Sequence, residues 1–259
     1  MSIAAVPALR AWLEHDEMLL RLRLSRPKAN IIDAQMIGAL TEALDTYASH
    51  RALLAIVLDA EGPHFSFGAS VEEHLPERCA EMLAGLHALI VRFLECPAPV
   101  LAVVRGQCLG GGLELACAAS AIFAAPDSRV GQPEIKLGVF APAASCLLPE
   151  RIGRSAAEDM LLTGRSITAE EARDLRLVAA VADDPEHAAM EWFEQYLSDK
   201  SAAALRYAVQ AARIDYVPRV RHKLAALERL YLDDLMGTCD AFEGLHAFLD
   251  KRPARWEHR

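Results

Sequence analysis

Hydrophobic and polar positions follow two different periods along this chain. Leucine and arginine alternate over 20–24, which is the period of a half-buried strand, and the alternation over 9–13 predicts its hairpin partner. The pattern then breaks at 26–30, and Asp33 is placed to cap a helix that ends near Ala48. A strand pair followed by a helix indicates a mixed α/β fold.

Strands and helices continue to alternate through the middle of the chain. Apolar runs over 53–58 and 99–104 predict buried strands, and 72–96 is expected to be a helix because its apolar residues recur on one face. Near residue 200 the mixed pattern has given way to helical periodicity alone. We therefore expect an α/β region over 1–199 and a helical region over 200–259.

Three consecutive glycines, 110–112, follow the run 99–104 and precede a short predicted helix. Glycine permits tight turns and close approach, and a helix start offers unpaired N–H groups with positive partial charge. Glu114 lies two residues past the last glycine, and Glu134 lies twenty positions further on. Alone, such glycines predict only a turn, and Glu114 only a favourable contact with the helix dipole. Together these features predict an oxyanion hole beside two carboxyl groups.

Two motifs carry a resemblance to a known family. The sequence GGGLELA followed by GQPE is similar to the signature of the crotonase (enoyl-CoA hydratase/isomerase) superfamily, and His64–Ser70 resembles its second oxyanion-hole loop. The ending AFLDKRP also matches, so the resemblance covers essentially the whole chain. It implies a spiral of ββα repeats over 1–199 and a helical trimerisation region over 200–259. It also implies an acyl-CoA substrate and a homotrimer or a dimer of trimers.

The resemblance assigns roles to individual residues. It implies that the backbone N–H groups of Ala69 and Gly111 form the oxyanion hole. Retention of both carboxyl groups is typical of the hydratases, with Glu134 as the protonated acid and Glu114 as the base that holds the water. The residues expected to contact coenzyme A or the acyl group are Lys28, Ala29, Ser66, Gly68, Ser70, Gly110, Gln132, Pro142, Phe248 and Lys251.

One segment departs from the family pattern and narrows the expected substrate. Family hydratases usually have a glycine-rich run after the second glutamate, whereas this chain has APAASC at 141–146. Proline and alanine remove backbone freedom and add volume beside the acyl pocket. With FGASVEEHLP at 67–76, this run resembles the cyclohexa-1,5-diene-1-carbonyl-CoA hydratases of anaerobic benzoyl-CoA breakdown. Water addition to that diene would give 6-hydroxycyclohex-1-ene-1-carbonyl-CoA.

Other functions stay open at this point. The alternatives are a generic enoyl-CoA hydratase of fatty-acid oxidation, an enoyl-CoA isomerase or acyl-CoA hydrolase, and a catalytically silent scaffold with the same fold. Keeping both Glu114 and Glu134 argues against the scaffold, because burying acids without a task is costly.

Composition excludes several other classes of protein. A net charge of −9 disfavours nucleic acid as a partner, and no apolar run is long enough to predict a membrane span. Six cysteines without paired spacing indicate a reducing, cytoplasmic setting. His74 and His87 lack partners at ligand spacing, so we expect ordinary histidines and no metal site. No separate cofactor is expected, because coenzyme A is part of the substrate.

Overall fold

The computed structural model describes residues 7–259 and contains two sheets that share one spiral path. The first sheet has the order β1-β2-β3-β4-β6-β9, in which β1 and β2 are antiparallel and the other neighbours are parallel. Its strands are β1 (Leu9–Glu14), β2 (Leu19–Leu24), β3 (Ala55–Ala60), β4 (Val100–Val104), β6 (Ala121–Ala124) and β9 (Ala180–Val181).

The second sheet is small and has the order β5-β7-β8. Its strands are β5 (Gln107–Leu109), β7 (Arg129–Gly131) and β8 (Ser166–Thr168), and a parallel bridge from Ser66 to Cys108 adds one more position beside β5. Three successive turns of chain therefore pass from the first sheet to the second and then into a helix. This arrangement is the predicted spiral of ββα repeats.

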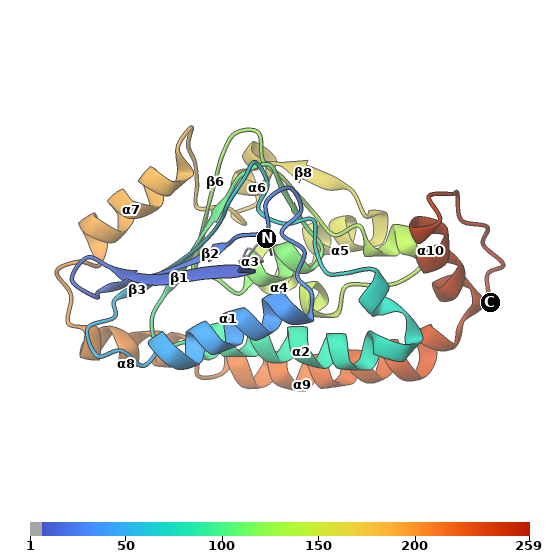
Figure 1. The fold of residues 1–259 in the computed structure, drawn as a ribbon, viewed down its shortest axis with the longest axis horizontal. Helices are drawn as coiled ribbons and strands as arrows, with labels where there is room; N and C mark the ends of the chain where they lie inside the picture. Colours follow the sequence, from blue (N-terminus) through green and yellow to red (C-terminus); the bar gives the residue numbers. More distant parts are fainter. Residues whose placement is uncertain (1–6) are drawn as a thin grey trace, which may run out of the picture.

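Helices cover the outside of the spiral (Figure 1). α2 contacts both α1 and α9, and these three run along one side of the molecule. The helices are α1 (Ala34–Tyr47), α2 (Pro76–Glu95), α3 (Gly111–Cys117), α4 (Pro142–Ile152), α5 (Arg154–Thr163), α6 (Ala169–Asp174), α7 (Pro185–Tyr196), α8 (Ala202–Arg213), α9 (Tyr216–Arg229) and α10 (Cys239–Leu249).

Most predicted elements are confirmed, with two corrections. The hairpin of β1 and β2 is present, and Asp33 caps α1 by accepting a hydrogen bond from the Met36 N–H. β2 is buried on both faces rather than half-buried, because Arg21 forms ion pairs with Asp59 and Glu186 at 2.9 Å each. The run 99–104 also does not lead directly into the glycines. β5 lies between them, and three residues are too few to show a strand period.

The C-terminal helices belong to the same hydrophobic core as the spiral. α9 contacts α2 and α4, and Val217, Val220 and Leu224 are buried in the main cluster.

Removing residues 201–259 would therefore expose one face of α2 and of α4. We expect the truncated protein to aggregate or to remain unfolded. A folded, soluble monomer by light scattering and circular dichroism would contradict this.

Candidate active site

Equivalent positions on three successive turns of the spiral meet at one edge of the second sheet. Leu109 N donates to Ser66 O and Gly110 N donates to Gly131 O, both at 3.0 Å. The chain segments that follow these contacts carry Ala69, Gly111 and Glu134. Parallel neighbours end at the same edge, so residues far apart in sequence are brought together there.

The two predicted oxyanion-hole amides face each other. A Cβ atom placed on Gly111 would lie 3.1 Å from Ala69 N, and one placed on Gly68 would lie 3.0 Å from Leu109 O. Gly68 has φ +106°, which side chains rarely adopt. Within residues 7–259, neither the Ala69 nor the Gly111 N–H donates a hydrogen bond to the protein. Two unpaired amides are therefore available to one oxygen atom of a ligand.

Glu114 is buried, and its carboxyl group meets the start of α4. Its Oε1 accepts a hydrogen bond from Ala144 N at 2.8 Å, and Pro142 occupies the first position of that helix. Burial raises the pKa of Glu114 above its usual value, and the amides of Ala144 and Ala143 and the charge of His87 offset part of this rise. The run that replaces the family's glycines thus forms a helix N-terminus that favours the ionised form of Glu114.

Glu134 begins a short 3-10 turn, Glu134–Leu137, directly after Pro133. Its Oε1 lies 2.6 Å from the position that a Cβ atom on Gly110 would take, so a side chain at position 110 would displace the carboxyl group. Although the residue as a whole is partly exposed, desolvation of the carboxyl group and the charge of Glu114 raise the pKa of Glu134 to about 8. Both pKa values are thus raised, but the helix amides and His87 offset the rise for Glu114, whereas the charge of Glu114 adds to the rise for Glu134.

Gln132 is buried, and its side-chain amide faces Glu134. With the nitrogen toward the carboxyl group, the amide donates to both oxygens, at 3.1 and 3.0 Å. With the oxygen toward it, Nε2 instead faces Gly110 O at 3.4 Å, and the amide oxygen is placed to accept from a protonated carboxyl. The two orientations match the two protonation states of Glu134.

His87 acts electrostatically on Glu114, although nothing in the sequence links the two residues. It is buried on α2, and its Nδ1 lies 2.6 Å from Glu228 Oε1 on α9. In the described part of the chain, its Nε2 has no hydrogen-bond partner. The charge of His87 lowers the pKa of Glu114, as stated above, so this histidine supports the ionised base.

Replacing His87 by glutamine should shift the pH dependence of turnover. The substitution removes a positive charge that lowers the pKa of Glu114, so that pKa should rise. We expect the acidic limb of the profile of kcat against pH to move to higher pH. His222→Gln, at an exposed position on α9, is the control. An unchanged acidic limb in His87→Gln would contradict the electrostatic role.

The remaining predicted site residues differ in how the structure uses them. Ser66 is buried and braces the loop, since its hydroxyl donates to Asn30 O and accepts from Gly68 N. Ser70 donates to Glu72 at 3.0 Å. Ala29 lies beside this loop and accepts from Phe67 N at 2.9 Å. Lys28 is exposed in the preceding turn, and Phe248 and Lys251 are exposed at the end of α10, where the structure gives them no contact with the two acids.

Two further observations concern residues 7–259. None of their helices is both long enough and apolar enough to cross a bilayer. Their histidine, cysteine and acidic side chains form no cluster of three or more with the geometry to hold a metal ion.

Comparison with known proteins agrees with this geometry. The family model for enoyl-CoA hydratase/isomerase matches residues 14–259. The chain is 58% identical, over all 259 residues and 100% of both chains, to the cyclohexa-1,5-dienecarbonyl-CoA hydratase of Thauera aromatica. It is 31% identical over 253 residues to the 2,3-dehydroadipyl-CoA hydratase of Escherichia coli, covering 95% of this chain and 98% of the other.

Solved structures confirm the predicted fold. An enoyl-CoA hydratase from Mycobacterium avium subsp. paratuberculosis superposes with a TM-score of 0.84 at 24% identity, covering 97% of this chain and 99% of the other. One from Bacillus halodurans gives a TM-score of 0.84 at 20% identity, covering 93% and 99%. The chain therefore belongs to the enoyl-CoA hydratase/isomerase family, the crotonase superfamily that its two glycine-containing motifs predict.

Proposed function

We propose that this protein adds water to a cyclic conjugated dienoyl-CoA, cyclohexa-1,5-diene-1-carbonyl-CoA, and forms 6-hydroxycyclohex-1-ene-1-carbonyl-CoA. Hydration is supported by one arrangement above all: two desolvated carboxyl groups lie beside two unpaired amides, and helix amides stabilise the ionised form of one of them, Glu114. A cyclic acyl group is supported by the 58% identity, over the full length of both chains, to the Thauera aromatica enzyme. A fatty-acid enoyl-CoA hydratase is the alternative.

Each group has a defined part in this reaction. The thioester oxygen accepts hydrogen bonds from the Ala69 and Gly111 amides, which stabilise the negative charge that develops on it. Glu114 takes a proton from water while the water oxygen bonds to the β-carbon. Electrons move through the enolate, and the far carbon of the diene takes the proton of Glu134. The product gains one hydroxyl, on the β-carbon, and one hydrogen, on the far diene carbon. Its remaining ring double bond lies between the α-carbon and the second carbon that flanks it in the ring.

The neighbourhood of the site suits a flat apolar ring. Tyr231 belongs to a buried apolar cluster, and Val71, Phe140 and Ala69, which carries one of the two amides, pack against this cluster. Phe140 and Tyr231 meet edge to face, with centroids 5.2 Å apart. Aromatic walls contact the face of a planar ring over a large area. A flexible acyl chain would lose more conformational freedom on entering the same space.

Hydration in deuterated water tests the proposal. Purified protein is incubated with cyclohexa-1,5-diene-1-carbonyl-CoA or crotonyl-CoA, and the product is analysed by mass and NMR. We expect faster turnover of the ring and deuterium at the far diene carbon. Deuterium at the α-carbon, or faster turnover of crotonyl-CoA, would favour the fatty-acid hydratase instead.

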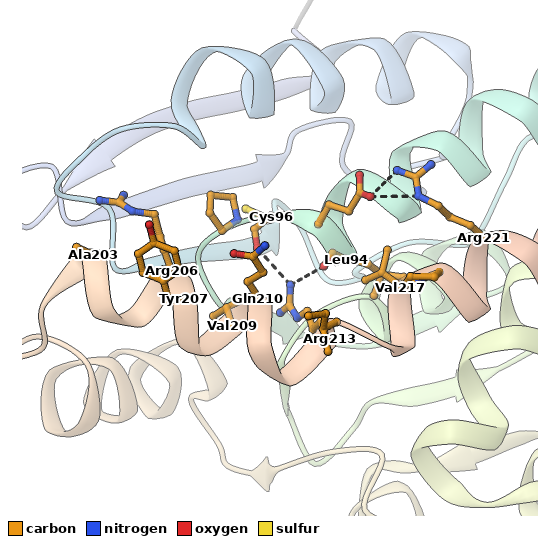
Figure 2. Close-up of a pocket in the computed structure, with 14 residues that line it drawn as sticks. Leu94, Cys96, Ala203, Arg206, Tyr207, Val209, Gln210, Arg213, Val217 and Arg221 are labelled. Carbon is orange, nitrogen blue, oxygen red and sulfur yellow. Dashed lines mark hydrogen bonds and ion pairs between the residues drawn. The ribbon is translucent and has the colours of Figure 1, made fainter.

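We also propose a homotrimer or a dimer of trimers. α8 has no buried residue; its Tyr207 is 74% exposed, and Ile214 directly after it is 73% exposed. Figure 2 shows the groove of about 740 Å³ that these elements form with the end of α2, where Arg213 bonds to the carbonyls of Leu94 and Cys96. An apolar surface of this kind is typical of an interface between subunits. Light scattering coupled to size exclusion measures the mass, and a monomer would overturn the assignment.

Two smaller assignments accompany this function. We place the enzyme in the cytoplasm, since Cys79, Cys96, Cys108, Cys117 and Cys146 are buried as free thiols.

We also assign Lys28 to the nucleotide end of coenzyme A, because it is exposed on the turn next to the Ser66 loop. Lys28→Ala should raise the KM for the thioester without changing kcat, and an unchanged KM would exclude that contact.

A further inference from the structure

Tyr231 is the largest fully buried side chain of the described residues and lies in an unusual backbone segment. The chain leaves α9 through a π-helical turn, Leu230–Asp234, before a short 3-10 turn. π-helical turns are rare, and they occur often at functional sites because the extra residue changes the direction of the side chains that follow. Here the turn directs Tyr231 into the interior, while Leu230 beside it is 48% exposed.

The phenol ring is well packed, but its hydroxyl is not satisfied. The ring meets Phe140 edge to face, and it shares a buried cluster with Cys79, Met82 and Val139 that packs against Ala69. No protein group within residues 7–259 forms a hydrogen bond with the Tyr231 hydroxyl. A buried hydroxyl without a partner costs about 1 to 3 kcal/mol, and a phenylalanine would fill the same space without that cost.

The Tyr231 ring lies in a cluster that packs against Ala69, which carries one of the two unpaired amides. Burial raises the pKa of Tyr231 most, and the charges of Cys79, Glu134 and Glu114 raise it further. The phenol therefore stays neutral, and it can both donate and accept a hydrogen bond at any pH at which the enzyme works. A neutral, buried hydroxyl without a protein partner is suited to hold a water molecule or an alcohol.

We propose that the Tyr231 hydroxyl binds the oxygen atom that the reaction adds, first as water and then as the hydroxyl of the product. This inference rests on the proposed hydration. Water has two hydrogens. Glu114 removes one as a proton, and the Tyr231 oxygen accepts a hydrogen bond from the other, so that a lone pair of the water is directed at the β-carbon. After addition, Tyr231 donates to the new hydroxyl. The protein thereby satisfies its unpaired hydroxyl only when water or product is bound.

Tyr231→Phe removes the hydroxyl and keeps the ring, so it isolates this contact. The probes are 6-hydroxycyclohex-1-ene-1-carbonyl-CoA and cyclohex-1-ene-1-carbonyl-CoA, which differ by one hydroxyl. We expect the variant to bind the hydroxylated thioester about 10-fold more weakly and the other thioester as wild type does. Hydration kcat/KM should fall by a similar factor. The matched control is Tyr216→Phe, at a half-buried tyrosine at the start of α9, the helix that precedes this turn.

Several outcomes separate this inference from the proposed substrate. Equal loss, or no loss, for the two thioesters would overturn the role of Tyr231 and leave a packing residue. If wild type hydrates crotonyl-CoA rather than the ring, the substrate proposal fails, and the comparison is repeated with 3-hydroxybutyryl-CoA and butyryl-CoA. Circular dichroism and the melting temperature establish folding. If Tyr231→Phe is unstable, Tyr231→Met, which also lacks the hydroxyl, gives the same comparison.

Discussion

Glu134→Gln is expected to lower turnover at least about 100-fold while the hydroxylated thioester still binds nearly as tightly as to wild type. Glutamine keeps the size and the hydrogen-bonding capacity of the side chain, but it has no acidic proton to deliver to carbon. The loss should therefore appear in kcat rather than in binding. The measurement is steady-state hydration together with titration of the product-like thioester.

Glu114→Gln should cause a loss of similar size for a different reason. The amide cannot accept the proton of the attacking water, although it can still accept the hydrogen bond of the Ala144 amide. Glu81→Gln, at an exposed position on α2 away from these contacts, is the control for the same chemical change. Wild-type turnover in either active-site variant would refute the assignment of two acids.

The alkaline side of the pH profile should report Glu134. Its pKa of about 8 means that the proton-donating form is lost as the pH rises through that value, so turnover should fall there. The measured value belongs to the coupled pair of acids. Because the negative charge of Glu114 helps to raise the pKa of Glu134, residual activity of Glu114→Gln should decline at lower pH. An alkaline limb that stays in place would show that the two carboxyls do not interact.

The sequence indicates the candidate catalytic groups more clearly than it indicates the strands that carry them. Glu114, Glu134 and the two glycine-containing loops are all identifiable, because close backbone approach and buried acids restrict the residue types. β5 and β7 have only three residues each, and they are held by their neighbours rather than by a hydrophobic period of their own. The stacking of three successive turns, which assembles the site, is therefore visible only in three dimensions.

Other groups to which we assign a role gave no signal in the sequence. His87 and Glu228 are 141 positions apart, and each lies in an ordinary helical pattern. Tyr231 follows a helix whose period predicts simple continuation, and the π-helical turn that directs it inward depends on packing against Phe140 and Val139. Such contacts depend on the tertiary arrangement of α2, α9 and the segment before α4. A pattern within one segment cannot reveal them.

The run at 141–146 shows how the structure refines an interpretation made from composition. Proline and alanine were expected to make a stiff apolar wall, and their side chains are indeed buried. The backbone of this run also contacts Glu114: Pro142 starts α4, and the Ala144 amide donates a hydrogen bond to the carboxyl group of Glu114. Proline is favoured at the first helical position, because no N–H is needed there. The departure from the family's glycines therefore concerns the base as well as the shape of the acyl pocket.

Gly111→Ala is expected to lower turnover by about 100-fold, because the oxyanion hole has no room for another carbon. The new Cβ would lie 3.1 Å from Ala69 N and 3.2 Å from Ala69 Cβ, so the two loops must move apart by a few tenths of an ångström. The two amides would then no longer be aimed at one oxygen atom. Loss of one such donor typically costs about 100- to 1000-fold in rate.

A spectroscopic measurement distinguishes this effect from general damage to the fold. Two aligned amides polarise the bound thioester carbonyl and lower its stretching frequency, so in Gly111→Ala that frequency should return toward the value of the free thioester. Gly38→Ala is the control, since that position on α1 is exposed and its added carbon meets nothing within 4 Å. Alanine is also the better helix former there, so the control should be as stable as wild type or more stable. Wild-type turnover and an unshifted carbonyl frequency in Gly111→Ala would place the oxyanion hole elsewhere.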